Sequence, residues 1–232
     1  MENIENKVAP GELNIGAVTR QSLPNAIAQS LRQQITEGHI APGMRLDERI
    51  LCEQLKVSRT PLREAFRLLA ADGLVEMKPN RGAYVILLSE KDINETFEIM
   101  LGLEVLSGEL ACKRITTHQL SKIKKLTNKM QECYESGNLP AYYKLNSEIH
   151  ELISRASGNS HLVELYSRLN MRIQNIRYSS NLAKDKWSMA MKDHQEMVDA
   201  LEQRDAERMA EIMKRHVKNK QRFSMSDEIT SA

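Results

Sequence analysis

The sequence contains little of what marks several large classes of protein. Aromatic residues make up only 4% of the 232 residues, whereas methionine occurs 12 times, a bias that favours a core built by helices. The three cysteines, Cys52, Cys112 and Cys133, are far apart and lack CxxC spacing, which argues against a disulfide framework and a thiolate zinc site. We therefore expect a mainly α fold in a reducing compartment, the cytoplasm.

Long apolar segments and export signals are also missing. The longest apolar run, from Tyr84 to Leu88, is far shorter than the roughly 20 residues that a membrane helix needs. The N-terminal segment MENIENKV has neither the basic nor the apolar region of a signal peptide. We expect no membrane segment and no membrane partner.

Composition and length indicate a two-domain globular protein. Hydrophobic residues make up 41% and charged residues 28%, and a chain of this length usually divides into two units. The formal charge of +2 is small, but residues 20–86 carry ten Lys and Arg against seven Asp and Glu, so the basic surplus is localised. The expected organisation is a mobile arm (1–20), a small domain (21–88), a larger helical domain (89–224) and a frayed tail (225–232).

The small domain has the pattern of three helices. Leu23, Ile27, Leu31 and Ile35 recur at every fourth position, which predicts an amphipathic helix that ends before Gly38. A short second helix is predicted over 47–55. A third is predicted over 58–72, with Ser58 as its N-cap and a glycine directly after its end.

A hairpin is predicted after the third helix. Apolar segments at 74–77 and 83–86 flank the basic turn 78–82, which contains proline and glycine. Helix, helix, tight turn, helix and two-stranded hairpin together form a winged helix-turn-helix, the N-terminal part of the predicted mainly α fold.

The third helix has an arginine stripe at Arg59, Arg63 and Arg67, on a different face from its apolar residues. The planar guanidinium pairs with guanine or clamps a phosphate, and a helix fits the major groove. An isolated arginine stripe is more often a solvated face, which here would pair with Glu64 and Asp72. The adjacent hairpin and tight turn favour contact with double-stranded DNA.

The segment PGMRLDERILCEQLKVSRTPLREAFRLLAADGLVEMKPNRGAYV resembles the DNA-binding domain of the GntR family of bacterial transcription regulators. The resemblance covers about residues 22–86 and rests on PG-x-x-L, VSRTPxREA, GLV and an RGxxV wing. It implies that DNA is contacted by the second helix, by the start of the third and by the wing tip. The positions that match are Arg49, Ser58, Arg59, Thr60, Arg63, Arg81 and Gly82. We expect Arg59 and Arg63 to contact bases, Arg49 and Ser58 to hold phosphates, and Arg81 to sense groove width, whereas Arg67 is a surface or phosphate-contacting residue.

The rest of the chain predicts an all-helical bundle, because no further strand pattern appears after Ser89. Three of the six histidines, His150, His194 and His216, lie on three different predicted helices, and Asn146 precedes His150 by one turn. Imidazoles from separate helices can form a metal site, but a single histidine on an amphipathic helix is more often a surface or core residue. The six predicted helices span 90–114, 117–136, 139–156, 159–181, 185–203 and 205–223.

Four stretches of the bundle, FEIMLGLE, LNSEIHELISRASGN, DHQEMVDALEQRDAERM and Arg215-His216, are similar to the FadR C-terminal (FCD) class of effector domains. In that class an acidic residue and three histidines hold a divalent metal, with a carboxylate effector beside it. The resemblance implies a zinc or nickel site on Asn146, His150, His194 and His216. Two departures stand out: Asn146 replaces the acidic ligand, and Met100 replaces an arginine. Arg172 and Arg177 are the remaining candidates for effector binding, although both could be surface charges. Six helices indicate the smaller VanR-like subgroup.

These features together predict a transcriptional regulator rather than an enzyme. It would bind a palindromic operator as a homodimer, because one small winged helix makes few DNA contacts, and it would respond to a small carboxylate. Two alternatives stay open. One is an effector-independent DNA-binding protein with structural histidines. The other is a His-cluster metalloenzyme fused to a DNA-binding domain, although the sequence has no HExxH motif and no nucleophile elbow.

Overall fold

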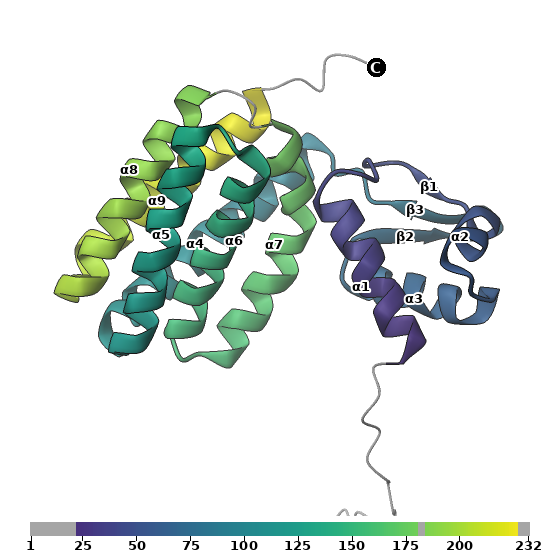
Figure 1. Ribbon diagram of the computed structural model, residues 1–232, viewed down its shortest axis with the longest axis horizontal. Helices are drawn as coiled ribbons and strands as arrows, with labels where there is room; N and C mark the ends of the chain where they lie inside the picture. Colours follow the sequence, from purple (N-terminus) through teal and green to yellow (C-terminus); the bar gives the residue numbers. More distant parts are fainter. Residues whose placement is uncertain (1–21, 181–183, 227–232) are drawn as a thin grey trace, which may run out of the picture.

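The computed structural model describes residues 22–180 and 184–226, with side chains described for 22–173 and 187–222. The predicted arm at 1–20 and the end of the predicted tail lie outside these residues. The mainly α fold is confirmed: a winged helix-turn-helix is followed by a helical bundle (Figure 1).

The N-terminal unit comprises helices α1 (Leu23–Thr36), α2 (Glu48–Leu55) and α3 (Arg59–Ala71) with strands β1 (Arg45–Leu46), β2 (Val75–Lys78) and β3 (Gly82–Val85). Its core is formed by the apolar faces of α1 and α3 and by the inner side of the sheet, with Phe66 and Leu62 fully buried. Three residues of the predicted stripe of α1, Ile27, Leu31 and Ile35, are buried in this core, whereas the first, Leu23, is 52% exposed.

The sheet contains the predicted hairpin, formed by β2 and β3, and adds a third strand to it. β1 pairs antiparallel with β3, so the strand order is β1-β3-β2. Backbone hydrogen bonds of 2.9 Å from Gly43 and to Met44 continue this pairing to Val85. Two residues are too few to show the alternation of a strand, which is why the pattern of β1 resembled a turn.

The cap of α3 also differs in detail from the prediction. Ser58 occupies the N-cap position with an extended backbone, but its side chain makes no capping hydrogen bond within the described chain. The preceding turn bends at Lys56, whose φ of 54° is left-handed. Asp47 does cap α2, because its carboxylate accepts hydrogen bonds from the backbone N–H groups of Arg49 and Ile50.

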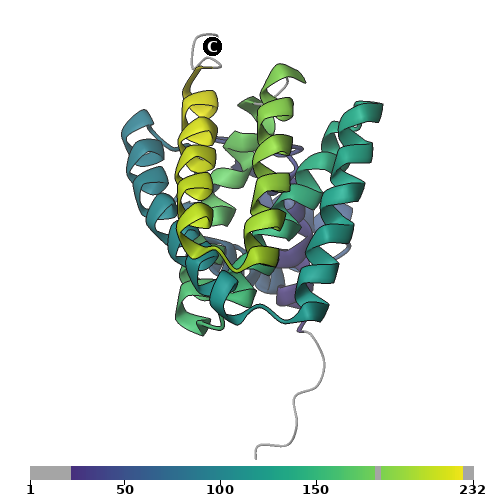
Figure 2. The same cartoon turned by 90° about the vertical axis from the view of Figure 1, so that its left-hand side faces the viewer.

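The helical unit comprises α4 (Glu90–Arg114), α5 (Thr117–Ser136), α6 (Leu139–Ala156), α7 (Ser160–Ser180), α8 (Lys184–Gln203) and α9 (Ala206–Ser226). The predicted bounds of the first three are confirmed. Capping boxes at Ser89 and Thr116 and a left-handed Gly137 explain this agreement, since each is a signal visible in the sequence. Figure 2 shows α8 and α9 side by side on the face away from the N-terminal unit.

The close approach of α4 to α9 depends on a glycine. A Cβ at Gly108 would lie 2.6 Å from Cγ of Met209 and 3.3 Å from Cγ of Met213. At this position the methionine side chains of α9 therefore pack directly against the backbone of α4. This contact sets how closely α9 approaches the buried face of α4.

The two units meet at α1 and α7, which lie beside each other in Figure 1. Met171 of α7 packs against the core of the N-terminal unit. One helix of the bundle therefore contributes to the core that supports the DNA-binding helices.

Candidate DNA-binding surface and histidine cluster

A basic concave surface lines a groove between α2, α3 and the β2–β3 wing, and the groove has a volume of about 800 Å³. Seven basic and only two acidic side chains line it, so its field attracts a polyanion. It brings together the predicted residues Arg49, Arg59, Arg63, Arg81 and Gly82, together with Arg67.

Local geometry explains why the wing tip reaches this surface. Asn80 and Gly82 have positive φ values of 58° and 91°, which turn the chain between β2 and β3. A glycine suits the second position because a Cβ there is strained. Arg45 of β1 lies beside Gly82, with its Nε 3.8 Å from the position that a Cβ would take.

Two basic residues of this surface, Arg45 and Lys78, were not among the predicted DNA-contacting residues. Arg45 became visible only with the third strand, which places it opposite Tyr84. Lys78 is held over the ring of Tyr84, 5.0 Å from its centroid. Ser58 and Thr60 are exposed at the start of α3 but are not among the lining residues, and their DNA contacts stay predictions.

One arginine of the surface is engaged by a carboxylate of the neighbouring helix. Nε of Arg63 donates to both carboxylate oxygens of Glu48, each at 3.0 Å. This pairing raises the pKa of Arg63, which stays charged. Glu48 thus positions Arg63 and at the same time competes with any anion that approaches it.

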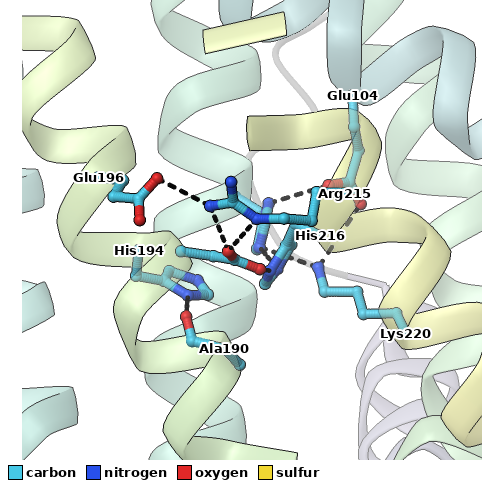
Figure 3. A network of polar contacts seen from close by, with 9 residues as sticks. Glu104, Ala190, His194, Glu196, Arg215, His216 and Lys220 are labelled. Carbon is cyan, nitrogen blue, oxygen red and sulfur yellow. Dashed lines mark hydrogen bonds and ion pairs between the residues drawn. The ribbon is translucent and has the colours of Figure 1, made fainter. Parts of the chain in front are cut away.

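A second candidate site lies in the core of the helical unit, where His150, His194 and His216 converge from α6, α8 and α9. All three are buried, and one nitrogen of each lies within 4.8 Å of the others. The ring centroids are 4.8 to 5.1 Å apart. The three predicted histidines therefore form one cluster, part of which is drawn in Figure 3.

Acceptors outside the cluster hold the Nδ1 atom of each ring. Nδ1 of His194 donates to the carbonyl of Ala190 at 2.7 Å, and Nδ1 of His216 donates to Oδ2 of Asp193 at 3.1 Å. Nδ1 of His150 lies 3.2 Å from Oε2 of Glu104. In neutral rings these partners place the protons on Nδ1, so the three Nε2 atoms present lone pairs to one another.

The cluster is electron-rich as a result. Nε2 of His150 and Nε2 of His216 are 3.1 Å apart, and Nε2 of His194 is buried with no hydrogen-bond partner among the described residues. Burial holds the pKa of His194 well below its usual range, so this ring is neutral near pH 7. Converging neutral imidazole nitrogens are the ligands that zinc and nickel prefer, and the residues present fit a divalent ion.

Asp193 connects α8 to α9 beneath the cluster. It neighbours His194 in sequence but pairs with His216 of the other helix, and it also accepts from Arg215 at 2.8 Å. Burial raises the pKa of Asp193, and the hydrogen bonds from Arg215 oppose that rise. Figure 3 shows Arg215 reaching Glu196 as well, at 2.8 Å.

Glu104 and Lys220 belong to the same site, although neither was predicted from the sequence. Glu104 lies on α4 with 2% of its side chain exposed, and Nζ of Lys220 lies 3.7 Å from its Oε1 and 2.9 Å from Nε2 of His150. A glutamate among the buried positions Phe97, Met100 and Gly108 of α4 was the signal available for Glu104. Lys220 follows His216 by one turn, which was its only signal.

Asn146, the fourth predicted ligand, lies one turn before His150 on α6 and is half-buried. It lines a groove of about 720 Å³ with residues of α1, α6 and α7. Its role as a ligand stays a prediction. Met100, at the position where the family has an arginine, is fully buried in an apolar cluster and offers no partner to a carboxylate.

Arg172 lies at the junction of the two units. A Cβ at Gly73, directly after α3, would be 3.1 Å from Cδ of Arg172, and the guanidinium helps to lower the pKa of Asp92. These contacts are with the end of α3 and the start of α4. The other predicted effector residue, Arg177, lies outside the described side chains.

Within the part of the chain that the structure describes, no helix is both long and apolar enough to cross a membrane.

Comparison with known proteins finds a family match for each of the two units. The family profile described as "Bacterial regulatory proteins, gntR family" matches residues 23–85, and "FCD domain" matches residues 95–219. A relative described as "Probable D-xylose utilization operon transcriptional repressor" from Paenarthrobacter nicotinovorans is 30% identical over 86% of this chain and 88% of its own. The transcriptional repressor RspR of Escherichia coli is 26% identical over 85% of this chain and 86% of its own.

Solved structures share the fold. McbR/YncC of E. coli has a TM-score of 0.77 and 23% identity over 86% of this chain and 95% of its own. The metal-free FCD domain of TM0439 has a TM-score of 0.54 and 24% identity over 62% of this chain and 99% of its own. The chain belongs to the GntR family, with an FCD domain as its helical unit, and is a DNA-binding transcriptional regulator.

Proposed function

We propose that the protein is a ligand-responsive, sequence-specific regulator that binds a palindromic operator as a homodimer in the cytoplasm. The basic surface supplies DNA contact through Arg49, Arg59, Arg63 and Arg81. A single unit of this size buries little DNA surface, and two-fold pairing doubles its phosphate and base contacts. The named relatives are transcriptional regulators, which supports a role without catalysis.

The effector site is proposed to hold a divalent ion on His150, His194 and His216, with Asn146 as a neutral fourth ligand. The observation that carries this proposal is the convergence of three buried Nε2 atoms whose rings are fixed from behind. When bound, the ion would supply open coordination positions for a small carboxylate effector. Supporting partners at Nδ1 are typical of metal-binding histidines, which supports the proposed metal site.

The carboxylate effector needs a cationic partner besides the ion. Arg177 keeps this proposed role. The described contacts of Arg172 favour a role at the junction of the two units instead, because its side chain meets the end of α3 and not the histidines. Effector binding would then change operator affinity by a coupling of about 1 to 3 kcal/mol, the range of typical allosteric systems.

Metal content tests the proposal most directly. The purified protein is expected to contain about one divalent ion per chain by mass spectrometry, as three fixed histidines imply. The double variant His150→Ala/His194→Ala should lose it. A matched control, His118→Ala/His161→Ala, removes two exposed histidines outside the cluster and should keep it.

Absence of metal from the wild-type protein, even after addition of zinc or nickel, would refute the metal site and leave structural histidines. A screen of small carboxylates on operator binding, measured by fluorescence anisotropy, then tests the effector separately. Equal operator affinity with and without every compound would support the effector-independent alternative.

A further inference from the structure

Lys220 donates a hydrogen bond into the centre of the histidine cluster. Its Nζ lies 2.9 Å from Nε2 of His150, the nitrogen that also faces His216 across 3.1 Å. The lysine stem is mostly covered, with 12% of its side chain exposed. The ammonium is therefore a built part of the buried site.

We propose that Lys220 is an internal cation of this site, which occupies His150 when no metal is bound and competes with a divalent ion for it. The inference rests on the metal site of the proposed function. Nε2 of His150 has one lone pair, which either accepts the Lys220 hydrogen bond or bonds to an ion. The two arrangements exclude each other at this nitrogen.

Charge acts in the same direction. The carboxylate of Glu104 on α4 is buried. Its Oε2 lies 3.2 Å from Nδ1 of His150, and its Oε1 lies 3.7 Å from Nζ of Lys220. The pair of Glu104 and Lys220 is neutral without an ion. A divalent ion would add two positive charges next to an ammonium that is already there, in an interior where such repulsion is poorly screened.

Glu104 also gives Lys220 an alternative position. A small rotation of the flexible lysine stem toward Oε1 would release His150 and keep the ion pair. Metal binding would then be an exchange between two cations, and the affinity for metal would be lower than three histidines alone provide. Asn146 lowers it further, since a neutral amide replaces a carboxylate.

The experiment is a titration of apo-protein with zinc alone, in competition with a chromophoric chelator. Lys220→Met keeps the length and the apolar stem of the side chain and removes its charge and its donor. Lys218→Met is the matched control, because Lys218 is an exposed lysine of the same helix. We expect zinc to bind at least about tenfold more tightly to Lys220→Met than to the wild type, and equally to the wild type and Lys218→Met.

The alternatives separate clearly. Equal affinities for the wild type and Lys220→Met would overturn the role of Lys220 while leaving the metal site standing, and weaker binding to Lys220→Met would do the same. No zinc binding to any of the three proteins would overturn both proposals. Circular dichroism verifies folding, and Lys220→Gln, which is shorter and neutral, replaces Lys220→Met if that variant does not fold.

Discussion

The buried pair of Glu104 and Lys220 should be one of the strongest electrostatic couplings in the helical unit. Oε1 and Nζ are 3.7 Å apart, and the side chains are 2% and 12% exposed. Coulomb's law with an effective dielectric constant of about 20 gives about 4 kcal/mol at this distance. Removing one partner leaves the other buried without its counter-charge, which typically costs about 3 to 5 kcal/mol.

A double-mutant cycle of Glu104→Gln and Lys220→Met isolates this term. We expect the double variant to be more stable than the sum of the two single losses predicts, by about 2 to 4 kcal/mol, because both charges disappear together. Urea unfolding of metal-free protein, followed by circular dichroism, measures the four free energies of unfolding. Additive losses, within about 0.5 kcal/mol, would show that the two charges do not interact and that the placement of Lys220 is wrong.

Two further predictions concern the DNA surface and the packing of α4. Glu48→Gln should tighten operator binding, because Arg63 loses the carboxylate that competes with DNA for its guanidinium; unchanged affinity in anisotropy titrations would contradict this. Gly108→Ala should lower the free energy of unfolding by about 1 to 2 kcal/mol, since overpacking costs more than the gain in helix propensity. A Cβ added at Gly102 of the same helix would meet no atom within 4 Å, so Gly102→Ala should raise the free energy of unfolding by up to about 1 kcal/mol. Equal changes in the free energy of unfolding for the two variants, measured in urea, would refute the packing argument.

Local signals explain what could be predicted from the sequence. The helix-turn-helix and the first bundle helices begin and end at capping residues and left-handed glycines, which act within a few residues of the chain. β1 was missed because its two residues become a strand only through pairing with β3. Arg45 was missed for the same reason. Ser58 does occupy the N-cap position of α3, but its residue type alone does not ensure the capping hydrogen bond.

The histidine cluster could be predicted from the sequence only in part. The resemblance selected His150, His194 and His216, and the structure brings them together. The partners that fix the rings were harder to find. Asp193 is next to His194 in sequence but pairs with His216, and such cross-helix pairing depends on how α8 faces α9. Glu104 is far from all three histidines along the chain, and it becomes their neighbour because α4 packs against both α6 and α9.

The contacts of α7 give a physical route between the two units. On one side α7 packs against α4, α6 and α9, the helices that carry Glu104, His150, His216 and Lys220. On the other side Met171 enters the core of the N-terminal unit, and Arg172 lies against Gly73. Gly73 ends α3 with a φ of 72°, and its missing side chain leaves just enough room for the arginine stem. Through Met171 and Arg172, α7 therefore touches both the core of the N-terminal unit and the end of α3, the helix that carries the arginine stripe.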